Sequence, residues 1–288
     1  MITWCRRRLG GPTVGIDRSS DELEIALELH LTGKVAVVTG ASKGIGLAIT
    51  RSLAEEGVTV VAGALHGSDE LDLLADRFAV HAVKVDLAEA GGPSYLIEEA
   101  AGRHQGLDIL VNNVGAVRPR LDGFLAVTDE EWTATLTINF LAALRSIRAA
   151  LPHMLGRPSP SIVTIASVNA SLPDPTVIDY SAAKGALSNL CKSLSKEFGP
   201  RGVRVNTISP GPVQTDLWLG TGGVAETVAR ARGLHPDEVA GSAAADSPTG
   251  RFTTPQEVAD LALLLASDRA SNVNGSDFVI DGGLITTL

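Results

Sequence analysis

An apolar run that ends in a glycine-rich turn places the strongest limit on the fold of this chain. Residues 35–38, Val-Ala-Val-Val, have the composition of a buried strand, and residues 45–56 beyond the turn have that of a helix. Gly40, Gly44 and Gly46 permit a tight turn and the close approach of a phosphate to the backbone. The free N–H groups and partial positive charge at the start of such a helix suit a pyrophosphate. The turn predicts a dinucleotide site, although similar turns also occur for packing alone.

The alternation of strand and helix continues to the end of the chain. Strands are expected near 35–39, 58–63, 80–85, 108–112, 161–166, 202–208 and 276–280. Helices are expected near 45–56, 69–78, 93–103, 129–154, 180–198 and 255–266. Thr128 with Glu131 and Thr254 with Glu257 have the spacing of capping boxes, which mark helix starts. This order predicts an α/β fold in a single domain, a doubly wound, parallel, seven-stranded, Rossmann-like sheet that binds ligands at the carboxyl ends of its strands.

Two segments do not follow this alternation. Residues 1–31 are predicted to form an N-terminal extension, partly disordered, before a domain that spans 32–288. Within the extension, Leu23–Leu31 has the period of a strand but the composition of a helix, which leaves both open. Residues 214–250 make a long connection that begins with a Leu-Trp-Leu run at 217–219. We expect a substrate lid there, with a static insertion or a subunit contact as the alternative.

Composition excludes several classes of function. The chain of 288 residues is long enough for one large domain, and its formal net charge of −9 argues against a nucleic-acid partner. No apolar stretch approaches the roughly 18 residues that cross a bilayer, so no membrane partner is expected. Cys5 and Cys191 make no disulfide framework, and no cluster of Cys and His suggests a metal. A reducing cytoplasm is the expected location.

A second group of residues suits proton transfer at a carbonyl oxygen. Tyr180 and Lys184 are four residues apart on a predicted helix and so share one face, and Ser167 follows an expected strand. A free tyrosine, with a pKa near ~10, is a weak base at neutral pH. A nearby ammonium lowers that pKa because it favours the phenolate. The spacing alone is common in helices, and it gains weight from the glycine-rich turn upstream.

Taken together, these motifs resemble the short-chain dehydrogenase/reductase family in its compact single-domain form. The matching positions cover about residues 32–285, in the order Thr39 to Gly46, Asp86, Asn112 to Gly115, Asn139, Ser167, Tyr180, Lys184, Pro210-Gly211 and Thr215. Any one of these motifs is weak evidence, whereas the ordered set is specific. The departures are Val114, where alanine is usual, and the N-terminal extension.

The resemblance implies a role for each catalytic position. Tyr180 would be the general acid in reduction and the general base in oxidation. Lys184 would lower the pKa of Tyr180 and hydrogen-bond the nicotinamide ribose, and Ser167 would hold the substrate oxygen. Asn139 would hold a water molecule in a proton relay to the lysine. Each of these residues alone has an ordinary structural explanation, such as a core tyrosine or a solvated lysine.

The resemblance also implies which residues contact a nicotinamide dinucleotide. Asp86 and Leu87 would contact the adenine, Asn113 would lie near the adenine ribose, and the loop from Pro210 to Thr215 would hold the carboxamide. The complete expected set is Gly40, Ser42, Lys43, Gly44, Ile45, Gly46, Asp86, Leu87, Asn113, Gly115, Tyr180, Lys184, Pro210, Gly211, Val213 and Thr215.

The end of the second expected strand bears on the choice between NAD and NADP. An acidic residue there would bind the ribose 2′-hydroxyl and repel a 2′-phosphate, but Ala64 occupies the position. Lys43 could pair with a 2′-phosphate, assisted by His66, although Leu65 stands where an arginine is usual. NADP(H) is therefore favoured over NAD(H).

These features predict an NAD(P)-dependent oxidoreductase that transfers a hydride between a nicotinamide and the carbonyl or secondary alcohol of a small molecule. A narrower alternative is a 3-oxoacyl-carrier-protein reductase, which would need a basic patch. The candidates for that patch are Arg118, Arg120, Arg230 and Arg232. The alternative from another class is a dinucleotide-sensing protein without turnover, which would be expected to lack Tyr180 or Lys184. The resemblance also implies a homo-oligomer, commonly a tetramer.

Overall fold

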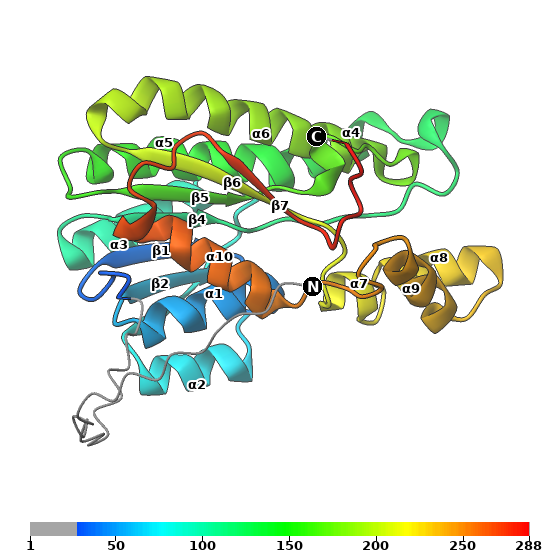
Figure 1. Ribbon diagram of the computed structural model, residues 1–288, viewed down its shortest axis with the longest axis horizontal. Helices are drawn as coiled ribbons and strands as arrows, with labels where there is room; N and C mark the ends of the chain where they lie inside the picture. The colour runs from blue at the N-terminus through cyan, green and yellow to red at the C-terminus, as the bar shows by residue number, and fades with distance from the viewer. Residues whose placement is uncertain (1–27, 288) are drawn as a thin grey trace, which may run out of the picture.

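The computed structural model describes residues 28–287. Seven strands form one sheet, in which each neighbouring pair is parallel and the order is β3-β2-β1-β4-β5-β6-β7 (Figure 1). The strands are β1 (Val35–Thr39), β2 (Thr59–Ala64), β3 (Val80–Lys84), β4 (Ile109–Asn112), β5 (Ser161–Ile165), β6 (Arg204–Pro210) and β7 (Asp277–Ile280). The predicted doubly wound, seven-stranded parallel sheet is confirmed. Most of the predicted extension 1–31, including residues 23–27 of the undecided segment, lies outside the described part of the chain.

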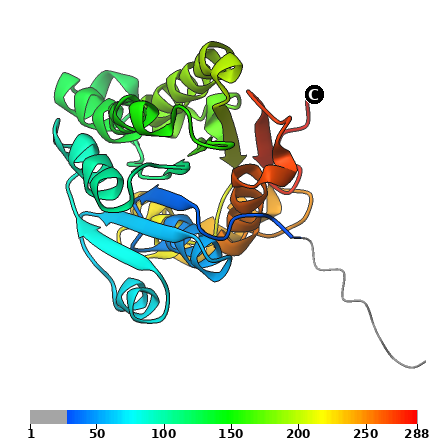
Figure 2. The same ribbon diagram turned by 90° about the vertical axis from the view of Figure 1, so that its left-hand side faces the viewer.

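Helices cover both faces of this sheet (Figure 2). They are α1 (Gly44–Glu55), α2 (Asp69–Arg77), α3 (Gly92–His104), α4 (Asp129–Leu136), α5 (Ala142–Met154), α6 (Ile178–Phe198), α7 (Asp216–Leu219), α8 (Val224–Arg232), α9 (Pro236–Ala245) and α10 (Pro255–Ala266). Five of the six predicted helices are present to within two residues at each end, and both predicted capping boxes are formed.

The two apolar cores follow from the alternation of side chains along the buried strands. On β1, Ala36 and Val38 belong to the core beneath α1, α2 and α10, while Val35 and Val37 belong to the core beneath α3, α5 and α6. Successive residues of a strand point to opposite faces, and both faces are covered, so the strand is apolar throughout. Leu31 is also buried in the first core, at 1% exposure, so the packed domain includes the last residue of the predicted extension.

The strand order reverses at β1, which pairs with β2 on one side and β4 on the other. Val38 pairs with Val111, so the two strands end side by side. The Thr39 hydroxyl donates to the Val111 carbonyl at 3.2 Å and accepts the Asn113 N–H at 2.9 Å, which ties the two strand ends together. The helices that follow β1 and β4 leave in opposite directions, and the crevice between them is where ligands bind in folds of this kind.

The expected helix over 129–154 is interrupted. A π-helical turn, η2 (Thr137–Leu141), separates α4 from α5. Asn139 lies in this turn, and its side-chain amide donates to the Thr135 carbonyl at 3.0 Å and to the Ala116 carbonyl at 2.8 Å. The wide turn thus accommodates a side chain that is bonded both to its own helix and to the loop after β4. Such turns occur often at functional sites.

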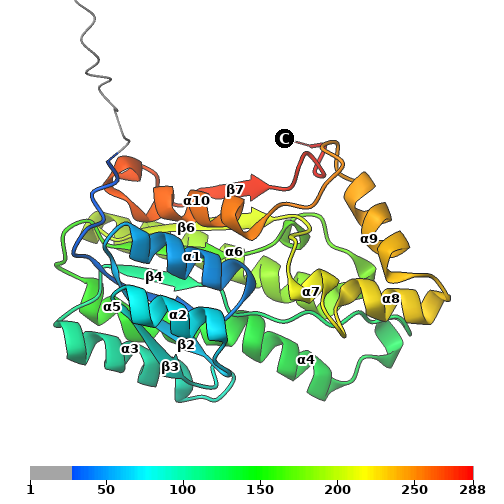
Figure 3. The same cartoon turned by 90° about the horizontal axis from the view of Figure 1, so that it is seen from below.

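The long connection over 214–250 contains three short helices, α7, α8 and α9, which lie beyond the carboxyl ends of the strands (Figure 3). A parallel bridge between Val213 and Thr253 closes the base of this segment. The Trp218 ring packs edge-on against Phe252, with 5.3 Å between the ring centroids. The segment is therefore anchored at both ends while its middle projects over the edge of the sheet.

Candidate active site

A cavity of about 1450 Å³ opens at the carboxyl ends of the strands. Most of the residues expected from the sequence line it: Gly40, Ser42, Lys43, Gly44, Ile45, Asp86, Leu87, Asn113, Gly115, Ser167, Tyr180, Lys184, Pro210, Gly211, Val213 and Thr215. Gly46 and Asn139 are not part of its wall, but each touches residues that are. The structure therefore brings the two groups of motifs, which are distant in sequence, into one space.

The glycine-rich turn after β1 has the geometry that a phosphate cradle needs. Gly40 and Gly44 have φ angles of +67° and +56°, a region that residues with a side chain rarely adopt. A Cβ on Gly46 would collide with the Gly40 carbonyl and lie 2.5 Å from the Asn113 amide nitrogen. At Lys43, which caps α1, no side chain bonds the first N–H groups of the helix. The chain therefore meets the backbone requirements for a pyrophosphate at this helix start.

Asn113 holds this turn in place. Its side-chain amide donates to the carbonyls of Thr39 and Gly40, both at 3.0 Å. The residue still lines the cavity, as expected, but its carboxamide nitrogen is committed to the end of β1. Asp86 and Leu87 stand at the end of β3, where the Asp86 carboxylate accepts the Ala88 N–H at 2.8 Å.

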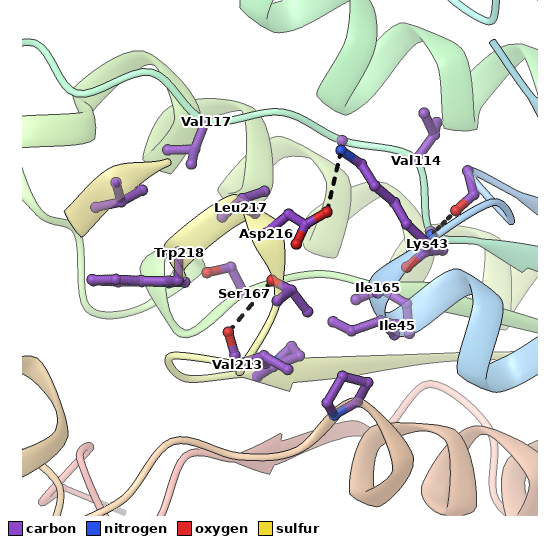
Figure 4. Close-up of a pocket in the computed structure, with 18 of the residues that line it drawn as sticks. Lys43, Ile45, Val114, Val117, Ile165, Ser167, Val213, Asp216, Leu217 and Trp218 are labelled. Carbon is purple, nitrogen blue, oxygen red and sulfur yellow. Dashed lines mark hydrogen bonds and ion pairs between the residues drawn. The ribbon is translucent and has the colours of Figure 1, made fainter. Parts of the chain in front are cut away.

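At the α1 side of the cavity, the wall carries a cation that the sequence motifs did not predict. Arg51 of α1 lines the cavity together with Lys43. Arg51 follows Leu47, another lining residue, by one helical turn, and that spacing was the signal available in the sequence. The Lys43 ammonium lies 4.0 Å from the carboxylate of Asp216, and both side chains are about 70% exposed (Figure 4). Ala64, the last residue of β2, and Leu65 after it carry no carboxylate.

The Tyr180, Lys184 and Ser167 side chains meet at the inner end of the cavity. Tyr180 and Lys184 extend from one face of α6, and the ammonium lies 5.6 Å from the centroid of the phenol ring. Lys184 is only 2% exposed and donates to the Ile165 carbonyl at 2.8 Å. Ser167 follows β5, where its hydroxyl accepts the Asn169 N–H at 3.2 Å. The predicted shared helix face is thus present.

Burial changes the proton affinity of both groups on α6. It raises the pKa of the Tyr180 phenol, and a hydrogen bond from Ser167 offsets part of that rise. Burial also lowers the pKa of Lys184 to about 8, because the ammonium loses water without gaining a carboxylate. The net direction at Tyr180 is opposite to the expected depression. The physical reason is that the loss of water from the phenol has the largest effect on its pKa. Burial also disfavours the charged form of Lys184, which lies beside the ring.

Asn139 supports the same inner wall from behind. It is 1% exposed, and its side-chain oxygen accepts the Ala116 N–H at 3.1 Å. A Cβ on Gly115 would lie 2.8 Å from that oxygen and 3.7 Å from the Lys184 ammonium. The absence of a side chain at Gly115 thus leaves the space in which Asn139 and Lys184 approach each other.

The loop from Pro210 to Thr215 forms the opposite wall. The Gly211 N–H donates to the Ile280 carbonyl at 3.0 Å, and the Thr215 hydroxyl donates to the Val213 carbonyl at 3.4 Å. Beyond this loop the wall is mainly apolar, and Figure 4 shows Val117, Leu217 and Trp218 on one side of Asp216, with Lys43 on the other. The further lining residues that sequence reasoning missed include Val224, Val228, Ala243 and Leu284.

Neither a metal cluster nor a membrane-spanning helix is present in the described part of the chain. Residues 28–287 contain no group of three or more His, Cys, Asp or Glu side chains able to hold a metal ion. Within the same range, no helix has both the length and the apolar character to cross a membrane.

A family model described as enoyl-(acyl carrier protein) reductase matches residues 40–285. The chain belongs to the short-chain dehydrogenase/reductase family. This dehydrogenase/reductase is 36% identical over 260 residues to the oxidoreductase UcpA of Salmonella typhimurium, covering 88% of this chain and 95% of that one. It is 32% identical over 262 residues to the 3-oxoacyl-[acyl-carrier-protein] reductase FabG of Thermotoga maritima, covering 89% of this chain and all of that one.

The fold matches a solved structure of L-sorbose reductase from Gluconobacter frateurii, in complex with NADPH and L-sorbose. The TM-score is 0.83 at 33% identity, and the match covers 91% of this chain and 100% of the other. The dehydrogenase/reductase is therefore a nicotinamide-dependent oxidoreductase, which transfers a hydride between its cofactor and a carbonyl or alcohol group.

The burial of Lys184 makes the stability of this enzyme depend on pH in a defined direction. Its pKa is about 8 in the folded chain and 10.5 ordinarily, so between these values the unfolded chain binds more protons and stability rises with pH. Relative to a Lys184→Met variant, the unaltered enzyme should gain about 3 kcal/mol of unfolding free energy between pH 7 and pH 11. Denaturant unfolding of both proteins measures this difference, in which other titrating groups cancel.

The matched control is Lys196→Met, because Lys196 is an exposed lysine on the same helix. Its stability difference from the unaltered enzyme should stay constant over the same pH range. If the difference in unfolding free energy between Lys184→Met and the unaltered enzyme also stayed constant with pH, the lowered pKa of Lys184 would be contradicted.

Proposed function

We propose that Tyr180 is the acid and base of the reaction, and that Ser167, Lys184 and Asn139 complete the catalytic group. A bound nicotinamide supplies or accepts the hydride. In reduction Tyr180 donates its proton to the carbonyl oxygen, and in oxidation it takes the proton back. The observation that carries this proposal is that Tyr180, Ser167 and Lys184 line one cavity, with the Lys184 ammonium 5.6 Å from the centroid of the phenol ring. The raised pKa keeps the phenol protonated at neutral pH, which is the form that donates a proton in reduction.

Ser167, Lys184 and Asn139 position the substrate or supply protons to Tyr180. Ser167 holds the substrate oxygen beside the phenol. The hydrogen bond between Ser167 and Tyr180 supports this role. Lys184 returns a proton to Tyr180 after transfer, and its pKa of about 8 suits a group that exchanges protons near neutral pH. Asn139 anchors the water-mediated relay to that lysine, and the support is that both the Asn139 side-chain oxygen and the Lys184 ammonium lie next to Gly115.

Replacement of Tyr180 by phenylalanine tests the assignment. Tyr180→Phe removes the transferable proton and should lower kcat by roughly 10²–10⁴-fold, the usual contribution of general acid–base catalysis. Binding of NADPH, measured by fluorescence titration, should change by less than about twofold, because the ring remains. Tyr95, the second of the two tyrosines, is 52% exposed on α3 and outside the cavity, so Tyr95→Phe is the matched control. Full turnover in Tyr180→Phe would sink the proposal.

We propose that the cofactor is NADP(H) rather than NAD(H), held by the sixteen expected positions that include the glycine-rich turn and the loop after β6. Three observations support this preference: Ala64 puts no carboxylate at the end of β2, while Lys43 and Arg51 add positive charge to the adenosine side of the cavity. The similar sorbose reductase was solved with NADPH. A 2′-phosphate would thus meet cations and no acidic residue at the end of β2.

Lys43→Ala should weaken NADPH binding by about tenfold while NADH binding changes little, since one charge-assisted contact to the phosphate is lost. Paired titrations with the two cofactors measure the ratio of their dissociation constants. Lys196→Ala, which removes an exposed lysine distant in sequence on α6, should leave both constants unchanged. Equal losses for NADPH and NADH in Lys43→Ala would refute the cofactor assignment.

We propose an uncharged ketone or secondary alcohol as the substrate, covered by a lid formed from residues 214–250. The support is the apolar outer wall, with Val117 from the loop after β4 and Leu217 and Trp218 from α7. The acyl-carrier alternative draws support from the FabG relative. However, one member of its expected basic patch is not available to a partner, because the Arg120 side chain is buried against Asp179.

A substrate panel with a lid variant separates these possibilities. Neutral ketones should be reduced with lower KM than acyl thioesters on carrier protein, and Trp218→Ala should raise the KM for ketones by about tenfold through lost apolar contact. Trp132→Ala is the control, because Trp132 lies on α4 outside the cavity wall. A strong preference for the carrier-bound substrate would favour the alternative instead.

We further propose that the enzyme is a homo-oligomer, as tetramers are common in its family, and that it works in the cytoplasm. Strand β7 is an edge of the sheet, and it exposes Val279 at 48% while neighbouring α10 exposes Leu264 at 38%. An exposed apolar edge suits contact with a second copy. A sedimentation-equilibrium mass equal to the 29.9 kDa of one chain would contradict the oligomer. Cell fractionation tests the location, which the free, buried Cys191 supports.

A further inference from the structure

A buried ion pair lies immediately behind the tyrosine. Arg120, in the loop after β4, donates two hydrogen bonds to one carboxylate oxygen of Asp179, at 3.0 Å from Nε and 2.6 Å from Nη2. The side chains are only 8% and 1% exposed. Arg120 also pairs with Glu131 of α4, while its backbone N–H donates to the Thr176 carbonyl at 2.6 Å. The loop after β4 is thereby tied to the chain that leads into α6.

Asp179 also bonds the residue that follows it. Its second carboxylate oxygen accepts the backbone N–H of Tyr180 at 3.0 Å. That N–H belongs to the first turn of α6, where Val177 provides no side-chain cap. A negative charge in this turn also suits the positive end of the helix. The start of the helix that carries Tyr180 is therefore held by Asp179, and Asp179 is held by Arg120.

The same network reaches Asn139 through Thr135. The Thr135 hydroxyl donates to Asp179 at 2.7 Å, and the Thr135 carbonyl accepts from the Asn139 amide at 3.0 Å. Burial by itself raises the pKa of Asp179, but the bonds from Arg120 and Thr135 outweigh it and hold that pKa below its ordinary value. The carboxylate is therefore ionised at neutral pH and available to both partners. One carboxylate thus connects the supports of the tyrosine and of the asparagine.

We propose that Arg120 and Asp179 are positioning residues for the reaction, which set the orientation of Tyr180 toward the substrate oxygen. This inference rests on the proposed role of Tyr180 as acid and base. Neither side chain touches the reacting atoms, and both act through the first turn of α6 and through Thr135. Displacement of a catalytic group by about 1 Å can cost on the order of 100-fold in rate, so such support affects kcat directly.

The structure offers a matched control for this pair. Asp108 and Arg157 form another carboxylate–guanidinium pair, with bonds of 2.7 and 2.9 Å, and the Asp108 side chain is 4% exposed. Asp108 also accepts a backbone N–H, that of Val35 at the start of β1, at 2.9 Å. This pair lies at the amino ends of β1 and β4, opposite the cavity. Loss of the Asp179 or the Asp108 carboxylate leaves the paired guanidinium without its main partner. Only Asp179 lies next to Tyr180.

The experiment compares Asp179→Asn with Asp108→Asn, at a temperature where far-UV circular dichroism shows both folded. Asp179→Asn should lower kcat for a neutral ketone by roughly 10–100-fold, with the dissociation constant of NADPH changed by less than about twofold. Asp108→Asn should lower the melting temperature but keep kcat within about twofold. Arg120→Lys retains the positive charge, so its kcat should fall less than that of Arg120→Met. If Asp179→Asn does not fold, the comparison of these two Arg120 variants tests the proposal instead.

An unchanged kcat in Asp179→Asn, an equal loss in Asp108→Asn, or identical losses in the two Arg120 variants would overturn the inference. Each of these results would leave the assignment of Tyr180 intact. Full activity in Tyr180→Phe would instead remove the proposed acid and base, whatever the Asp179 variant shows, so the two failures are distinguishable.

Discussion

The pairing of β1 with β2 on one side and β4 on the other is the constraint on which the rest of this enzyme depends. It ends two parallel strands side by side and sends their helices to opposite faces, which leaves a crevice at the carboxyl edge of the sheet. The Thr39 hydroxyl and the Asn113 side-chain amide close this junction with five hydrogen bonds to neighbouring backbone groups. The glycine-rich turn is thereby held by hydrogen bonds in the geometry that a phosphate cradle needs.

Burial gives the other end of the cavity its chemistry. Lys184 and Tyr180 both lose water, and desolvation weakens the charged form of each, so the neutral phenol and a readily exchanged lysine proton coexist. In the proposed roles, the protonated phenol is the form that gives its proton to a carbonyl oxygen in reduction. The buried Asp179 carboxylate, paired with Arg120, holds the first turn of the helix that carries both groups. Orientation and proton affinity are thus provided by separate interactions.

Much of this could be predicted from local patterns. The apolar run at 35–38 and the capping boxes at Thr128 and Thr254 depend on nearby residues, and each was found where expected. The π-helical turn at Asn139 was missed, because it depends on a bond to Ala116, a residue of another loop. The predicted lowering of the Tyr180 pKa was wrong, again because the structure around the residue decides it. Proximity to Lys184 is visible in the spacing, whereas the depth of burial that dominates the pKa is not.

The sequence by itself determined the fold class, the family and the motif residues that line the cavity, since periodicity and ordered motifs are properties of the chain. Only the tertiary structure decided which charges are available to a ligand. Arg120 is buried in an ion pair, whereas the Lys43 side chain is about 70% exposed near Asp216. The sequence shows both only as cations. The tertiary structure also decided that Val117, Leu217 and Trp218 meet in one apolar wall. These outcomes depend on contacts between distant segments, which packing creates and local pattern does not encode.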